Sequence, residues 1–141
     1  AISFYNTTKN KTKMSLKIFN VENSNDPLKE IVRLRASEKV NLKGYAIVDR
    51  TFDQDGSLSN EFRHIYVFPK LELKKGDWVR LYTGKGTYST QQNASNSEET
   101  VHKLYWQSGE CVWNNAGGDT ATLIKFSAED SKIVPAVSTK K

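Results

Sequence analysis

Residues 112–123 read Val-Trp-Asn-Asn-Ala-Gly-Gly-Asp-Thr-Ala-Thr-Leu, and they are the most informative segment of the chain for its fold. One aromatic residue, Trp113, precedes two asparagines, two glycines and an Asp-Thr step, and apolar residues close both ends. Glycine adopts backbone conformations that other residues avoid, while Asn and Asp bond their own backbone in turns. The stretch therefore predicts a strand, a tight loop and a second strand, with Trp113 as a core anchor. We expect Asn114, Asn115 and Asp119 to bond backbone groups rather than a substrate.

The rest of the chain continues this pattern of short apolar runs separated by turn residues. Within residues 31–36, Val32 and Leu34 alternate with two arginines, as in a strand that buries one face. No segment carries a sustained apolar period of 3.6 residues. Other runs cover residues 16–19, 45–48, 63–68, 78–82, 104–106, 111–113, 120–126 and 133–137. About eight or nine short strands separated by turn signals predict an all-β protein with an immunoglobulin-like β-sandwich.

Polar tracts and turn residues set the expected boundaries of the domain. Residues 87–99 form a Ser/Thr/Gln/Asn tract with little apolar content, which predicts an exposed loop. Ser108-Gly109 predicts a hairpin turn between the runs before and after it. The chain divides into a flexible lead-in or linker over residues 1–13, a β-sandwich domain over 14–137 and a polar tail over 138–141.

The composition indicates one globular domain. The chain has 141 residues, 37% hydrophobic and 26% charged, which suffices for a single core. No apolar run approaches the roughly 20 residues of a membrane helix, so no membrane span is expected. A single cysteine, Cys111, excludes an internal disulfide and a cysteine-rich zinc site. The net charge of +5 permits anionic partners without demanding them.

The candidate metal ligands lack the spacing of a metal site. His64, His102 and Cys111 have suitable donor atoms, but no pair stands at the short interval of a zinc site. The segment that begins at Thr51 imitates a calcium loop. However, Thr51 and Phe62 occupy the first and twelfth positions, where Asp and Glu belong. We therefore expect no metal and no cofactor.

Candidate catalytic and phosphate-binding motifs are equally incomplete. Gly84-Lys85-Gly86-Thr87 lacks the earlier glycine of a nucleotide loop, and no helix pattern follows it. Cys111 could pair with His102 in a hydrolase, yet a cysteine inside an apolar run is more often packed than reactive. The sequence therefore predicts a protein that is not an enzyme, with this hydrolase as an alternative.

One strand combines aromatic and basic side chains. Trp78, Arg80 and Tyr82 alternate and so share a face, a pattern that can stack bases and meet phosphates. The same pattern fits a packed face whose aromatic rings are covered by long basic side chains. The possible nucleic-acid or partner surface comprises Arg63, Lys70, Trp78, Arg80, Tyr82 and Lys85.

Five further motifs occur in a fixed order along the chain. They are Glu30–Arg35, the step Val40–Tyr45, Phe68-Pro69, the passage Leu73–Val79 and the strand and turn Val79–Gly86. Together with residues 112–123 they resemble the lamin-tail domain, over nearly all of residues 14–137. The structural positions in this resemblance are Gly44, Pro69, Gly76, Trp113, Asn114, Asn115 and Asp119. The chain departs from the family pattern at Ala36-Ser37, where Asn is usual, and at Gly117-Gly118, where one glycine is commoner.

The resemblance implies a function as well as a fold. Lamin-tail domains are immunoglobulin-like β-sandwiches that act as non-catalytic binding or targeting modules, so a protein or cell-surface ligand is expected and a small-molecule substrate is not. The polar insert at residues 93–99 resembles bacterial members of the family. Such members imply a piece of a larger exported or cell-envelope protein. Nucleic acid stays an alternative partner.

Overall fold

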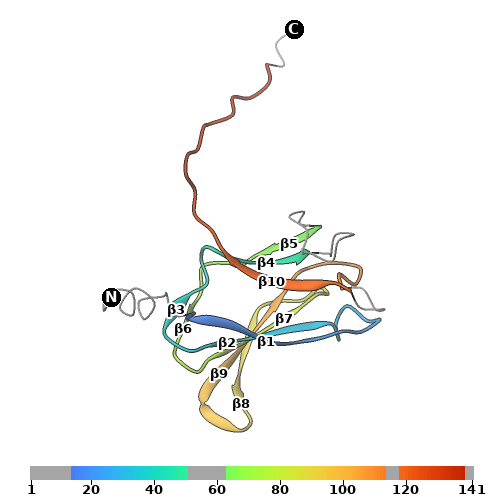
Figure 1. Ribbon diagram of the computed structural model, residues 1–141, viewed down its shortest axis with the longest axis vertical. Coiled ribbons are helices and arrows are strands. Elements are labelled where there is room, and N and C mark those ends of the chain that lie inside the picture. The colour runs from blue at the N-terminus through green and yellow to red at the C-terminus, as the bar shows by residue number, and fades with distance from the viewer. Residues whose placement is uncertain (1–13, 51–62, 114–117, 139–141) are drawn as a thin grey trace, which may run out of the picture.

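The computed structural model describes residues 14–50, 63–113 and 118–138, and the described residues form ten strands and no helix (Figure 1). The strands are β1 (Leu16–Glu22), β2 (Ile31–Ala36), β3 (Val40–Asn41), β4 (Tyr45–Arg50), β5 (His64–Val67), β6 (Glu72–Leu73), β7 (Trp78–Tyr82), β8 (Ser89–Asn93), β9 (Asn96–Tyr105) and β10 (Thr120–Lys125). The predicted all-β sandwich is confirmed.

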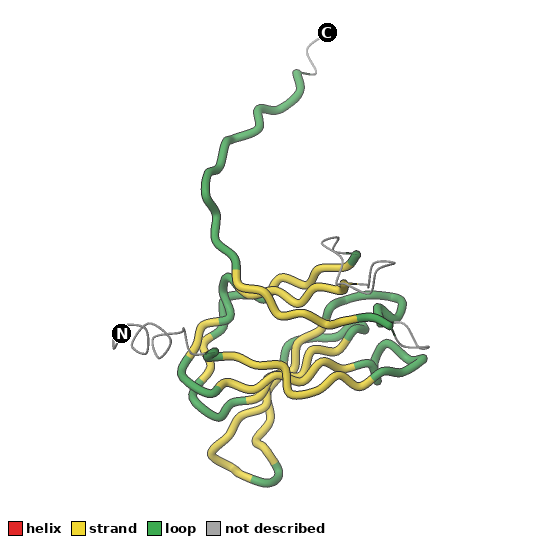
Figure 2. The backbone as a smooth tube through the Cα atoms, viewed as in Figure 1, coloured by secondary structure: helices red, strands yellow, loops and turns green. Residues whose placement is uncertain are grey.

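Two sheets form the layers of the sandwich (Figure 2). One has five strands in the order β1-β2-β7-β9-β8, and the other has three in the order β10-β4-β5. All pairs within them are antiparallel except β7 with β9, which run parallel. The strands β3 and β6 form a separate short pair. The hairpin of β8 and β9 projects beyond the two layers (Figure 1).

The core lies between the sheets, and β2 and β7 contribute alternate residues to it. Leu34 of β2, Ile47 of β4 and Val79 of β7 are fully buried. Trp113 is only 5% exposed, and its ring meets that of Trp106 edge-on with 6.0 Å between centroids. Trp113 thus lies where a core anchor is expected, although it is not in a strand.

Two glycines of the predicted signature have backbone angles that other residues rarely adopt. Gly44 has φ +87°, and an added Cβ would lie 3.2 Å from the carbonyl oxygen of Phe126. Gly76 has φ +91°, and its Cβ would lie 3.3 Å from the Glu99 carboxylate. Both positions combine a turn with a close approach, which is the role of glycine. Pro69 follows the end of β5 at Val67, consistent with its missing N–H.

The prediction of an exposed loop over residues 87–99 is wrong, because β8 and the first part of β9 pair there as an antiparallel hairpin. The side chains of β8 are mostly exposed, so no apolar alternation marks the strand. Backbone hydrogen bonds to β9 hold it instead. An edge strand whose two faces are both exposed to solvent has no alternation of apolar and polar residues, so a hydrophobicity pattern does not predict it.

The predicted hairpin around Ser108-Gly109 is also wrong. The residues before the turn belong to β9, which pairs with β7 and β8. The backbone amides of Val112 and Trp113 instead donate to the Glu30 carboxylate, at 2.7 and 3.4 Å. A buried acceptor side chain therefore replaces the strand partner that the apolar run predicted.

The last predicted strand does not form. Ile133, Val134 and Val137 are 95%, 87% and 88% exposed, and the segment runs away from the sandwich (Figure 1). No described strand pairs with it, and Pro135 offers no N–H to one. The predictions for residues 1–13, the segment 51–62, Asn114 and Asn115 lie outside the described residues. Nothing in the described part of the chain is a helix that could cross a membrane.

Candidate functional site

The outward face of the five-stranded sheet carries the aromatic and basic side chains. Along β7, Trp78, Arg80 and Tyr82 are half-buried, while Val79 and Leu81 between them are buried in the core. The structure thus places these three predicted residues on one face. Since this face points away from the other sheet, its side chains are accessible to a partner.

Three basic residues lie directly opposite one another on neighbouring strands of this face. Arg80 of β7 pairs in register with Arg33 of β2 on one side and with Lys103 of β9 on the other. We call Arg33, Arg80 and Lys103 the cationic row. Neighbouring strands are about 4.8 Å apart, so the row concentrates positive charge. Like charges placed directly opposite destabilise a sheet.

Among the described residues, Arg33 is the one member of the row that has a counter-charge. Arg33 donates to the Glu22 carboxylate at 2.9 Å and to the Asn20 amide oxygen at 3.3 Å. Arg80 and Lys103 make no side-chain hydrogen bond or ion pair with any of the residues that the structure describes. Two cations that repel each other therefore face solvent together, without a counter-charge from the described protein.

Aromatic pairs flank the cationic row on both sides. Toward the end of β7, Tyr82 stacks on Tyr105 with 5.0 Å between centroids. Toward its start, Phe19 meets Trp78 edge-on at 4.9 Å. Phe19 lies at a register shift between β1 and β2, and it is 62% exposed. Such bulges redirect a side chain and are frequent near functional sites.

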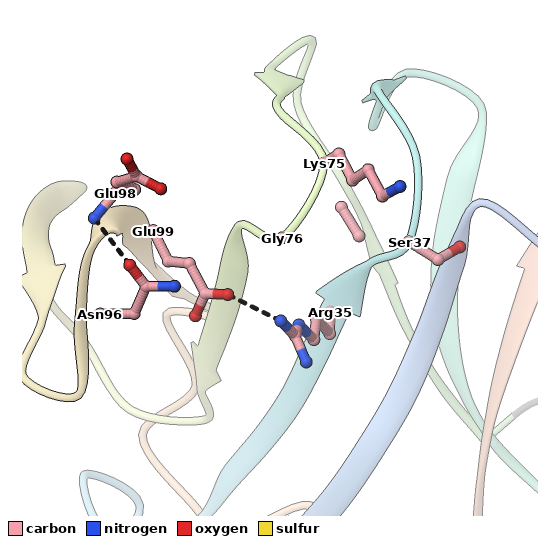
Figure 3. A pocket seen from close by; sticks show the side chains of 8 residues that line it. Arg35, Ser37, Lys75, Gly76, Asn96, Glu98 and Glu99 are labelled. Carbon is pink, nitrogen blue, oxygen red and sulfur yellow. Dashed lines mark hydrogen bonds and ion pairs between the residues drawn. The ribbon is translucent and has the colours of Figure 1, made fainter.

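A network around Glu99 fixes the orientation of Trp78. The Trp78 indole N–H donates to Glu99 at 3.0 Å, and the Arg35 guanidinium lies over the indole ring at 4.9 Å from its centroid. Glu99 also accepts hydrogen bonds from Asn93 at 2.8 Å and from Arg35 at 2.7 Å. The hydrogen bonds from Trp78 and Asn93, with the charge of Arg35, hold the pKa of Glu99 below its usual value. Figure 3 shows the Glu99 and Arg35 side chains pointing toward each other.

Glu99 lines one hollow, and its donors Trp78 and Asn93 line a second. The larger, of about 490 Å³, is shown in Figure 3 and is lined by Arg35, Ser37, Lys75, Asn96, Glu98 and Glu99. Its lining mixes both charges, and Arg35 is already paired with Glu99. The smaller, which we call the Trp78 hollow, is about 330 Å³ and is lined by Phe19, Asn20, Arg33, Trp78, Arg80 and Asn93, with Ser95 and Val101. Its lining contains no carboxylate, so an anion is better accommodated there.

The predicted six-residue surface is divided between different parts of the molecule. Arg63 directly precedes β5, which belongs to the other sheet, and its guanidinium lies 4.0 Å from Asp119. Lys70 is exposed after the end of β5. Lys85 is exposed in the turn after β7. Because β5 pairs with β4 and not with β7, Arg63 and Lys70 do not join the cationic row.

Several residues of this face were not among the predicted site residues: Phe19, Arg33, Glu99, Lys103 and Tyr105. Alternation does indicate that Arg33 faces outward. Its position beside Arg80, however, depends on the pairing of β2 with β7. The parallel pairing of β9 with β7 has no local signal at all, since it joins segments separated by a whole hairpin.

The candidate catalytic residues occupy separate positions. The Cys111 thiol donates to the Ser24 carbonyl at 3.2 Å, and burial, with the charge of Glu30, raises its pKa. His102 lies between Tyr88 and Asp77, at 2.8 and 3.3 Å from its two ring nitrogens. Cys111 and His102 thus have different partners, and in the described part of the chain no hydrogen bond joins them.

The Tyr88 hydroxyl lies beside His102, 2.8 Å from its Nδ1. Burial, with the charge of Asp77, raises the pKa of Tyr88, so its hydroxyl keeps the proton at neutral pH. Asp77 also accepts from the backbone amides of Lys74 and Thr100, which makes it a turn-stabilising residue. Among the described residues, His, Cys, Asp and Glu form no group of three that could hold a metal ion.

No protein-family model and no curated protein matches this chain. The lamin-tail resemblance therefore stays a prediction that rests on the motifs quoted above.

Proposed function

We propose that this chain is a non-enzymatic binding module that takes anionic partners on the outward face of its five-stranded sheet. The observation that carries the proposal is the cationic row. Arg80 and Lys103 repel each other and lack a counter-charge among the described residues. An anionic partner would remove this cost on binding. The lamin-tail resemblance supports the same non-catalytic role, as part of a larger exported or cell-envelope protein.

Retention on immobilised heparin, a polyanion, tests the proposal. The variant Arg80→Ala/Lys103→Ala should elute at a clearly lower salt concentration than the unmodified chain, because fewer counterions are released on binding. The matched control is Lys39→Ala/Lys43→Ala, which removes the same charge from two exposed positions near β3. Equal elution of the two variants would show that net charge alone is responsible, and the proposed surface would be wrong.

A further inference from the structure

We infer that the partner is single-stranded nucleic acid, with one base in the Trp78 hollow and the adjoining phosphate on the cationic row. The inference rests on the proposed function and names its ligand. The choice of nucleic acid as the ligand follows from the side chains that line the Trp78 hollow. Phe19 and Trp78 form an aromatic wall, Arg80 supplies positive charge that no described residue neutralises, and the Asn20 and Asn93 amides lie among them. A ligand that uses all three features has a planar apolar part, hydrogen-bonding edges and an anionic group.

The aromatic wall is set in position before any ligand arrives. The Trp78 ring is held at its N–H by Glu99 and on its face by Arg35. The ring of Phe19 is 62% exposed although it touches Trp78, because the bulge in β1 turns it outward. A preorganised aromatic surface loses little conformational freedom on binding, and base stacking on such a surface tolerates any sequence.

The second aromatic pair indicates a polymer rather than a single nucleotide. Trp78 and Tyr82 are four residues apart on β7, so they are about 13 Å apart along the strand. Arg80 lies midway between them. The face therefore repeats stacking group, cation and stacking group, which is the order of base, phosphate and base along a nucleic-acid strand. In a duplex the base faces are stacked on one another, so only a single strand presents them to these rings.

Fluorescence anisotropy on the full 141-residue chain tests this inference. The probe is a labelled oligothymidylate of about 12 nucleotides, within the usual site size of such sheets. The comparison probe is an abasic oligomer of equal length and charge. We expect the abasic oligomer to bind roughly tenfold more weakly, since it lacks the bases that stack on the aromatic rings.

Two variants separate stacking from charge. Phe19→Ala should weaken oligothymidylate binding roughly fivefold and leave abasic binding unchanged. Arg80→Ala should weaken both by a similar factor. Ile65→Ala is the control, because it removes a half-exposed apolar side chain from the other sheet. Phe19 is largely exposed, so its removal leaves the core intact.

Each outcome has a defined consequence. A roughly tenfold preference for the base-containing strand that falls to about twofold in Phe19→Ala supports the inference. Equal binding of the two probes would overturn it but leave the proposed function standing. The inference also fails, with the proposed function intact, if neither oligomer binds while heparin retention still depends on Arg80 and Lys103. That result would assign the face to an acidic polysaccharide. Failure to bind heparin and oligomers alike would overturn both.

Discussion

Glu30 and Glu99 each collect three hydrogen bonds, but from different kinds of donor. Glu30 is fully buried and accepts from the Thr83 hydroxyl at 2.7 Å and from the backbone amides of Val112 and Trp113. Its bond to Thr83 extends the pairing of β2 with β7, and its bonds to Val112 and Trp113 attach a segment that no strand pairing holds. The Glu30 carboxylate therefore stabilises the folded backbone.

Glu99, in contrast, is at the surface and accepts only from side chains. Its donors are Trp78, Asn93 and Arg35, two of which line the Trp78 hollow. Its bonds fix the rings and charges that face a partner, not the path of the backbone. The same chemical group thus stabilises the domain at one end of the sandwich and shapes the candidate surface at the other. Substitutions at the two ends should separate stability from binding.

The largest effect is expected at the buried end. Trp113→Ala should lower the free energy of unfolding by about 3–5 kcal/mol, because it removes a large core ring and leaves a cavity. Urea denaturation measures this loss. A change below about 1 kcal/mol, the level of a surface substitution, would contradict the core role.

Glu30→Ala should cost about 2–4 kcal/mol, since several buried donors lose their acceptor together. The same denaturation series measures it. Exposed Glu110→Ala is the control, because its side chain takes no part in these bonds and its removal should leave stability nearly unchanged. If Glu30→Ala unfolded at the same urea concentration as this control, the structural role of Glu30 would be refuted.

At the surface end, Glu99→Gln should weaken oligothymidylate binding by loosening Trp78 while leaving the fold intact.

The lowered pKa of Glu99 makes any stability contribution of this carboxylate pH-dependent. A carboxyl group whose pKa is lowered by folding stabilises the protein fully when the pH is above the usual pKa, which is 4.5 for Glu99. This stabilisation is lost as the pH falls through the lowered pKa.

The difference in melting temperature between the unmodified chain and Glu99→Gln should therefore shrink as pH falls below about 4.5. Glu98→Gln is the matched control, because Glu98 is exposed and only its backbone amide is bonded, to Asn96. A difference that stayed constant into acid would show that ionised Glu99 does not stabilise the fold.

The smallest effect has the opposite sign. Lys103→Gln should raise stability by about 0.2–1 kcal/mol at low salt, because it removes a like charge opposite Arg80. The gain should diminish as salt screens the repulsion. Thermal unfolding at two salt concentrations, with Lys39→Gln as control, measures it. A destabilised Lys103→Gln would mean that the cationic row carries no repulsive cost.

Local patterns predicted the elements that bury one face. Alternation in residues 31–36 gave both the extent of β2 and the outward direction of Arg33 and Arg35. The same rule failed for β8, where both faces are solvated, and for Ile133–Val137, where apolar residues have no partner strand. A hydrophobic pattern indicates which residues are suited to burial. It predicts a strand correctly only where those residues are buried and their backbone also pairs with a neighbouring strand.

The candidate surface was predictable only in part, for a related reason. Trp78, Arg80 and Tyr82 lie on one strand, so periodicity sufficed to place them on one face. Adding Arg63 and Lys70 required knowing which strand lies beside β7, and the neighbours proved to be β2 and β9. Such pairings depend on contacts between distant segments, which local propensity does not encode.

The parallel pairing of β7 with β9 has a consequence for the order of folding. Arg33, Arg80 and Lys103 come from three separate parts of the chain, and the last joins only when β9 docks beside β7. Non-local strand pairing forms slowly, because a long loop must close first. A chain emerging from the ribosome therefore has no complete cationic row until β9 has been synthesised and paired. Binding through this face would then report that β9 has joined the five-stranded sheet.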